Sequence, residues 1–299
     1  MTFEQLSLFV AVAEREHLTR AAEAVRLTPS AVSAAIRNLE AYYGVALFHR
    51  VGRRIELTQA GRLFLPEARA TLARAQSAAH MLSDLGSLRR GQLTIYASQT
   101  LSSYWLPPVL ARFQGLYPGV EVSLTTGNTQ GVAEAVRDGQ AEMGFIEGRI
   151  DMPALSVTSV ARDALIVVVS PAHPWADGRG LRLSDLSDTR WVLRESGSGT
   201  RAEFEAALSV QGGSVSGLEV WLTLPSNEAV LSAVRAGGTA TVVSALAAEP
   251  FLALGAAVRA NFPLPERHFS LLRHKERHQG RAAQALEALC LSPVSPETS

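Results

Sequence analysis

Residues 195–201 have the composition of an anion-binding turn. They read Glu-Ser-Gly-Ser-Gly-Thr-Arg, and they follow a predicted strand at residues 190–194 and precede a predicted helix. Glycines let the backbone turn tightly, and hydroxyl and N–H groups at the N-terminus of a helix converge on an anion. We therefore predict that a small anion binds at this turn. The hydroxyls assigned to it are those of Ser196, Ser198 and Thr200.

Three other strand-to-helix junctions carry the same chemistry, at residues 98–103, 125–129 and 225–227. Ligands of open α/β sheets bind beyond the carboxyl ends of the strands, so four such junctions around one crevice would offer donors but few fixed charges. Each hydroxyl alone is equally well explained as a helix cap, and the prediction depends on their convergence. The further residues assigned to this site are Ser98, Thr100, Ser102, Thr126, Asn128 and Asn227.

The same turn also matches the dinucleotide-binding fingerprint. Gly197, Gly199 and Ala202 have the G-x-G-x-x-A spacing, and Glu219 follows about twenty residues later. This alternative makes the chain a nucleotide-dependent oxidoreductase, and a plain structural turn is a third interpretation. The match lies in the middle of the chain, after a different α/β segment, and no catalytic acid/base set is evident. We therefore expect no enzyme activity and no bound cofactor.

Other candidate sites are weaker. The seven histidines are too dispersed for an H-E-x-x-H metal helix, and the sequence has neither a G-x-S-x-G elbow nor a phosphate loop with lysine. Arg267-His268 and residues 273–278 are basic, but they lie at the end of a predicted strand. A solvated face is the favoured interpretation of both, and a nucleic-acid patch is the alternative.

The region beyond residue 91 alternates between predicted strands and helices. Its first strands, with helices between them, indicate a βαβαβ unit with a parallel sheet, and a second alternation follows. Two α/β lobes joined by crossing segments would leave a crevice between them, and the last strand is expected to return to the first sheet. The strands are predicted at residues 93–97, 120–124, 142–146, 165–169, 190–194, 218–224, 240–243 and 269–273.

The N-terminal residues predict three short helices followed by a hairpin. The third helix runs from Thr28 to about Tyr43, with Thr28 as its cap and Pro29 at its first position. Its apolar side chains share one stripe, which leaves a small, polar face outward. Two short strands at residues 47–50 and 54–57 flank a tight turn.

A long helix is predicted from residue 58 to about residue 88. Its apolar residues step by three and four, which is the spacing of a heptad seam between two helices. The seam covers under three heptads and is half alanine, so packing of an amphipathic helix on its own domain is the alternative. Pro66 in the second turn predicts a kink. The seam consists of Leu65, Ala68, Leu72, Ala75, Ala79 and Leu82.

Charge is distributed unevenly along a chain whose net charge is zero. Residues 1–90 hold 12 arginines and 8 acidic residues, a balance of +4, and residues 91–299 hold 16 basic and 20 acidic residues, a balance of −4. A basic head on an acidic body suits contact with a polyanion at one end only. The single cysteine, Cys290, excludes an internal disulfide, and no apolar run reaches membrane-spanning length. We expect a cytoplasmic protein with no membrane contact.

The segment Ala21 to Ser33, with Ile36-Arg37, Gly44 and residues 47–50 after it, closely resembles the N-terminal domain of LysR-type transcriptional regulators. The resemblance continues to His274-Lys275 and covers nearly the whole chain. It implies a multi-domain regulator with a winged helix-turn-helix head, a long linker helix, and a two-lobed, periplasmic-binding-protein-like sensor. Such regulators bind double-stranded DNA and a small effector, and they assemble as dimers and usually tetramers.

The predicted third helix can enter the major groove of DNA while the basic hairpin meets flanking phosphates. Base contacts are assigned to Thr28, Pro29, Ser30, Ser33 and Arg37, and phosphate contacts to Arg50, Arg53 and Arg54. A solvated surface is the alternative for any one of them. The family often has Gln where Pro29 stands and larger side chains where Ala34 and Ala35 stand, so the base contacts depart from its pattern.

The expected domains are a head at residues 1–58, a linker and dimerisation helix at 59–90, and an effector-binding domain at 91–299. The first lobe of that domain takes residues of about 91–160 and 265–299, and the second about 161–264. A LysR-like protein whose sensor has lost its ligand and acts only by assembly is a further alternative.

Overall fold

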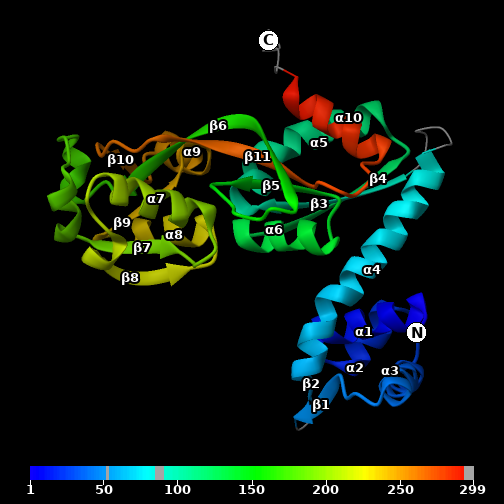
Figure 1. Ribbon diagram of the computed structural model, residues 1–299. Coiled ribbons are helices and arrows are strands. Elements are labelled where there is room, and N and C mark those ends of the chain that lie inside the picture. Colours follow the sequence, from blue (N-terminus) through cyan, green and yellow to red (C-terminus); the bar gives the residue numbers. More distant parts are fainter. Residues whose placement is uncertain (52–53, 85–90, 293–299) are drawn as a thin grey trace. The chain divides into compact units, whose positions relative to one another are not determined.

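The computed structural model describes residues 1–51, 54–84 and 91–292, and it divides into an N-terminal unit and a C-terminal unit (Figure 1). Each unit has its own hydrophobic core. The elements of the N-terminal unit are α1 (Phe3–Arg15), α2 (Leu18–Ala24), α3 (Pro29–Tyr43), β1 (Phe48–Val51), β2 (Arg54–Leu57) and α4 (Gln59–Asp84).

Helix α3 begins and ends where its sequence dictates. The Thr28 hydroxyl accepts a hydrogen bond from the Ala31 N–H, and Pro29 occupies the first turn, where a missing N–H costs nothing. Gly44 ends the helix in the left-handed conformation that favours glycine. The carboxylate of Glu40 on α3 accepts from the backbone N–H groups of Leu47, at 2.7 Å, and Phe48, at 3.0 Å. This contact fixes the helix against the β1–β2 hairpin.

Helix α4 continues through Pro66 as one element, and its first half packs on the head. Ala68 is fully buried in the core of the head, and Leu65 and Leu72 pack against that core. Ala79 is exposed, and the side chain of Leu82 lies outside the described residues. The first part of the seam therefore has a packing role inside its own domain, as the alternative interpretation held.

The C-terminal unit contains one mixed sheet with helices on its faces. Its strands run in the order β4-β3-β5-β11-β6-β9-β7-β8, and β10 also pairs with β6. The strands are β3 (Gly91–Ser98), β4 (Val120–Gly127), β5 (Met143–Glu147), β6 (Leu155–Val169), β7 (Arg190–Arg194), β8 (Glu219–Leu224), β9 (Thr239–Ser244), β10 (Val258–Ala260) and β11 (Glu266–His274). The helices are α5 (Leu106–Leu116), α6 (Thr129–Asp138), α7 (Gly199–Val210), α8 (Asn227–Arg235), α9 (Ala245–Ala253) and α10 (Arg281–Leu291).

Two long antiparallel strands join two lobes within this unit. Strand β3 pairs in parallel with β4 and β5 in the first lobe, and β7 pairs in parallel with β8 and β9 in the second. Strands β6 and β11 pair with each other and run from one lobe to the other (Figure 1). The late strand returns to the first sheet as predicted, because β11 pairs with β5. The strand predicted at residues 165–169 is only the second part of β6, which begins at Leu155.

Both faces of the second lobe's sheet are buried, which explains its continuous apolar strands. On β7, Trp191 and Leu193 point to one core cluster while Val192 points to another. The run Leu165 to Val169 on β6 alternates between the same two clusters. This packing fixes the strand ends that carry the polar residues of the site.

Candidate functional site

The described residues among the predicted DNA contacts lie on α3, at its N-cap or on the β1–β2 hairpin of the head. Thr28, Pro29 and Ser30 are exposed at the start of α3, and Ser33 and Arg37 follow along the same helix. The Arg37 guanidinium donates to the Ser33 hydroxyl at 2.8 Å, one helical turn away. Arg50 on β1 and Arg54 on β2 are exposed on the hairpin. Arg53 lies outside the described residues.

The predicted effector site is built around a buried carboxylate. Glu147 ends β5, and its side chain is 1% exposed. Its oxygens accept hydrogen bonds from the hydroxyl of Ser98, which ends β3, and from those of Thr100 and Thr200, each at 3.4 Å. Three of the predicted residues, from two lobes and far apart in sequence, therefore meet at one acid group.

Two buried arginines orient these hydroxyls. Arginine can only donate, so the Thr200 hydroxyl accepts from Arg267, at 3.0 Å, and keeps its own proton for Glu147. The Asn227 amide donates to the Thr100 hydroxyl at 3.1 Å, and Arg194 donates to the Asn227 oxygen at 2.9 Å. Both chains of hydrogen bonds, from Arg267 and from Arg194, therefore form relays that end with a hydroxyl proton directed at the Glu147 carboxylate.

Arg267 links this cluster to the strands that cross between the lobes. Its Nε donates to the Asp163 carboxylate at 2.7 Å, and both side chains are 1% exposed. The Ser244 hydroxyl donates to the other Asp163 oxygen at 2.8 Å. Among the described residues, one guanidinium nitrogen of Arg267 and the hydroxyl of Ser198 are buried without a hydrogen-bond partner. Buried donors of this kind are rare in native proteins unless a ligand or water satisfies them.

The expectation of few fixed charges at the junctions is wrong. Sequence reasoning missed the four buried charged side chains of Glu147, Asp163, Arg194 and Arg267, and it placed Arg267 on a solvated face, although this residue is 2% exposed. A signal for Glu147 existed, because it is a charged residue that ends an otherwise apolar strand.

The glycines of the turn are required by close packing. A Cβ on Gly199 would lie 2.1 Å from the backbone oxygen of Glu147, and Gly197 has a φ of +87°. The end of β5 therefore occupies the space next to Gly199 at the start of α7. A dinucleotide fingerprint instead needs its second glycine for close approach of a pyrophosphate, so this geometry disfavours the oxidoreductase interpretation.

The other predicted effector residues lie around the cluster with different partners. Thr126 donates to the Ser102 hydroxyl at 3.1 Å, and Ser102 in turn donates to the backbone oxygen of Gln99 at 3.1 Å. Asn128 caps α6 by accepting from the Gly131 N–H at 2.9 Å, and Ser196 is exposed. The structure thus brings Ser98, Thr100, Thr200 and Asn227 together, and gives Asn128 a capping role.

A polar contact on one edge of the cluster joins the two lobes. The Tyr104 hydroxyl donates to Glu228 at 2.8 Å, and Gln99 also donates to Glu228. Burial and the adjacent Glu228 carboxylate raise the pKa of Tyr104, so its hydroxyl stays protonated as a donor. Gln99 accepts from the Asn227 N–H at 2.6 Å. The start of α8 is thereby held against the first lobe.

The described residues include no group of three or more His, Cys, Asp or Glu side chains that could hold a metal ion. Within the same ranges, none of the helices has the length and apolar character needed to cross a membrane.

Two family models match the chain. One, described as the LysR substrate binding domain, matches residues 86–292, and one described as a bacterial regulatory helix-turn-helix protein of the lysR family matches residues 3–62. The chain belongs to the LysR family. LysR-family members are transcriptional regulators and not enzymes, with a DNA-binding helix-turn-helix and a domain that binds small effectors.

Relatives and solved structures agree with this LysR-family assignment. The chain is 34% identical over 292 residues to YeiE of Escherichia coli K12, described as an uncharacterized HTH-type transcriptional regulator, and the match covers 97% of each chain. It is 31% identical to a probable RuBisCO transcriptional regulator of Cyanophora paradoxa, covering 98% of this chain and 92% of that one. Full-length CbnR in complex with its target DNA superposes with a TM-score of 0.66 at 24% identity, covering 97% of this chain and 98% of that one. This last likeness shows the fold.

Proposed function

We propose that this LysR-family regulator binds a small anion at the Glu147 cluster and that this binding changes its affinity for DNA. The observation that carries the proposal is that the hydroxyls of Ser98, Thr100 and Thr200 already hold an acid group, the carboxylate of Glu147 itself. An effector with an acid group of similar size would take these donors in competition with Glu147. The buried, unpartnered nitrogen of Arg267 would supply a charged hydrogen bond that Glu147 does not use.

The effector test compares variants that remove one donor each. Thr200→Val keeps the side-chain shape and should lower anion affinity, because loss of a hydroxyl donor to a charged group costs about 1 to 3 kcal/mol. Ser98→Ala should act in the same direction from the other lobe. Ser209→Ala, on the exposed far end of α7, is the matched control. Calorimetry of the full-length protein with inorganic oxyanions, small carboxylates and phosphate monoesters measures the effect, and equal affinity in all variants contradicts the assignment.

DNA recognition is assigned to the surface formed by α3 and the β1–β2 hairpin. Ser33 and Arg37 are proposed to contact bases, and Arg50 and Arg54 to contact phosphates. Arg54→Ala should weaken binding to all duplexes and reduce its salt dependence, whereas Ser33→Ala should act mainly on the preferred site. Gel shifts with promoter fragments of the source genome at two salt concentrations distinguish these outcomes. Salt-independent binding contradicts the proposal.

Self-association is assigned to the second half of α4. Ala79 lies on the predicted seam and is exposed, while the earlier seam residues already pack on the head. Ala79→Glu should therefore weaken a dimer without disturbing that core. Ala78→Glu makes the same change at the neighbouring exposed position off the seam and is the control. Analytical ultracentrifugation tests this, and a wild-type monomer at micromolar concentration contradicts the assignment.

A further inference from the structure

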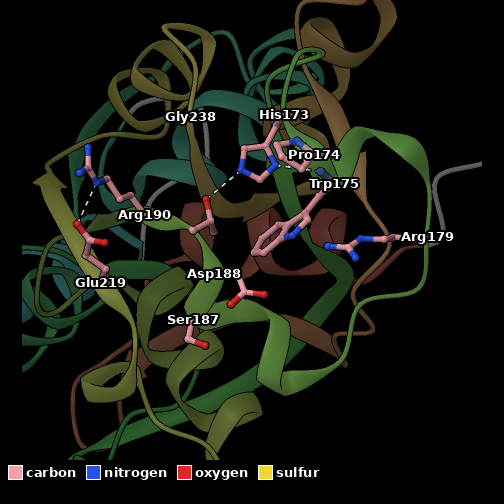
Figure 2. Close-up of a pocket in the computed structure, with 10 residues that line it drawn as sticks. His173, Pro174, Trp175, Arg179, Ser187, Asp188, Arg190, Glu219 and Gly238 are labelled. Atoms are coloured by element: carbon pink, nitrogen blue, oxygen red, sulfur yellow. Dashed lines mark hydrogen bonds and ion pairs between the residues drawn. The ribbon is translucent and has the colours of Figure 1, made fainter.

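A pocket opens in the C-terminal unit, away from the Glu147 cluster. Its volume is about 480 Å³, within the range of small-molecule sites (Figure 2). It is lined by His173, Pro174, Trp175, Arg179, Ser187, Asp188, Thr189, Arg190, Glu219 and Gly238.

The pocket and the Glu147 cluster lie at opposite ends of the same parallel strands. Strands β7 and β8 begin at the pocket residues Arg190 and Glu219, and β9 begins next to the pocket residue Gly238. The carboxyl end of β7 carries Arg194, which belongs to the relay toward Glu147. A strand rises about 3.3 Å per residue, so the two ends of β7 are roughly 13 Å apart. One small ligand cannot occupy both sites.

Thr189 presents a free proton at this pocket. The Nδ1 atom of His173 accepts from the Trp175 N–H at 3.1 Å, so Nε2 carries the ring proton and donates to the Thr189 hydroxyl at 2.9 Å. Burial lowers the pKa of His173, which keeps the ring neutral and this direction fixed. The Thr189 hydroxyl accepts from the ring, which leaves its own proton for an acceptor on a ligand.

A buried hydroxyl at the same end of the sheet lacks a partner. Thr239 follows Gly238 and is in register with Arg190 on β7, so the two side chains lie on the same face. Thr239 is 2% exposed, and its hydroxyl has no hydrogen-bond partner among the described residues. The hydroxyl of Ser170, which directly follows β6, has none there either. Buried hydroxyls without a partner are rare in native proteins, and a ligand or a water molecule would satisfy them.

Charges of both signs line the pocket. Arg190 pairs with Glu219 at 2.9 Å, and Figure 2 shows this pair on one side and Arg179 on the other, with Asp188 between them in that view. A simple anion would meet the carboxylates of Asp188 and Glu219, and a simple cation would meet the two guanidinium groups. A ligand that carries both charges finds a partner for each.

We propose that this pocket binds a small zwitterion of the α-amino acid class, with its carboxylate at Thr189 and Arg190 and its ammonium group at Asp188. The site is distinct from the anion site at Glu147, so the protein can take two ligands at once. This proposal does not depend on which anion binds at Glu147.

The test is a binding screen of the full-length protein with the twenty common L-amino acids, followed by calorimetry. We expect at least one of them to bind, and its N-acetyl and amide derivatives, which lack one charge, to bind at least about tenfold more weakly. Asp188→Asn and Thr189→Val should each weaken binding by a similar factor, since a hydrogen bond to a charged group is worth more than the 1.4 kcal/mol that corresponds to tenfold.

Two controls separate this proposal from other effects. Asp188 is exposed, so Asp188→Asn should fold normally, and its melting temperature without ligand verifies this. Thr200→Val, in the Glu147 cluster, should leave amino acid binding unchanged. Absence of binding by all twenty amino acids, or equal binding by wild type and both pocket variants, would overturn the proposal. Loss of binding in Thr200→Val alone would place the ligand at the Glu147 cluster and overturn it as well.

Discussion

Replacing Glu147 by glutamine is expected to tighten anion binding. In the proposed site the carboxylate holds the donors that an anionic effector would take, and it would also repel that effector. The Thr100 hydroxyl lies 3.4 Å from a Glu147 oxygen. An anion bound to this hydroxyl would sit about 6 Å from the carboxylate charge, since a hydrogen bond adds about 2.7 Å. Two unit charges at about 6 Å in a medium of effective dielectric constant about 20 repel by about 3 kcal/mol.

Removal of that repulsion corresponds to a gain of about a hundredfold in affinity, since 1.4 kcal/mol is tenfold. Glutamine keeps the size of the side chain and one acceptor oxygen, so the cluster should keep its shape. Calorimetry of wild type and Glu147→Gln with the same inorganic oxyanion measures the change. Glu205→Gln, which removes the same charge from an exposed position on α7, should have little effect because solvent screens it. Weaker or unchanged anion binding in Glu147→Gln would refute the competition argument.

Three further predictions concern the stability and chemistry of individual side chains. The single cysteine, Cys290, is buried, and burial together with Glu287 raises its pKa to about 12, so a thiol reagent at pH 8 should label it only after unfolding in urea; rapid labelling of the native protein contradicts this. Burial lowers the pKa of His173 below its unfolded-state pKa of 6.5. The neutral ring therefore contributes fully to the stability of the folded state above pH 6.5, and this contribution is lost as the pH falls below 6.5. His173→Gln should flatten the decrease of melting temperature between pH 7 and 5, and an identical decrease in the variant refutes this prediction. Thr28→Ala removes the cap of α3 and should lower the stability of the head by about 1 kcal/mol, as measured by urea unfolding, while a matched Thr19→Ala change on the exposed face of α2 should cost less.

The parts of the fold with local signals could be predicted from the sequence. Thr28 and Pro29 mark the start of α3, and their positions are confirmed. The strand end that carries Ser98 and the helix start that carries Thr200 could be located because apolar strands alternate with helices. Helix α10 has a readable signal as well, since Leu286 and Cys290 share its buried face, yet it was not predicted.

The remaining features depend on contacts between distant residues. After Leu155, the first part of β6 alternates between half-buried and exposed residues and contains Ser156 and Thr158. It forms a strand because β11 pairs with it. The buried charges could not be predicted from local patterns either. Arg267 has the sequence context of a surface cation, and only its pairing with Asp163, more than a hundred residues earlier, places it in the interior.

We propose that an anion bound at the Glu147 cluster changes the affinity of this regulator for DNA. The most direct test is fluorescence anisotropy of the full-length protein on a promoter fragment of the source genome, with and without the oxyanion that calorimetry identifies. The oxyanion should shift the dissociation constant of the wild-type protein for this DNA. Thr200→Val should bind the same DNA as tightly as wild type without the anion but show little shift with it. A wild-type dissociation constant that stays unchanged with a saturating, calorimetrically bound anion would show that anion binding and DNA binding are not coupled.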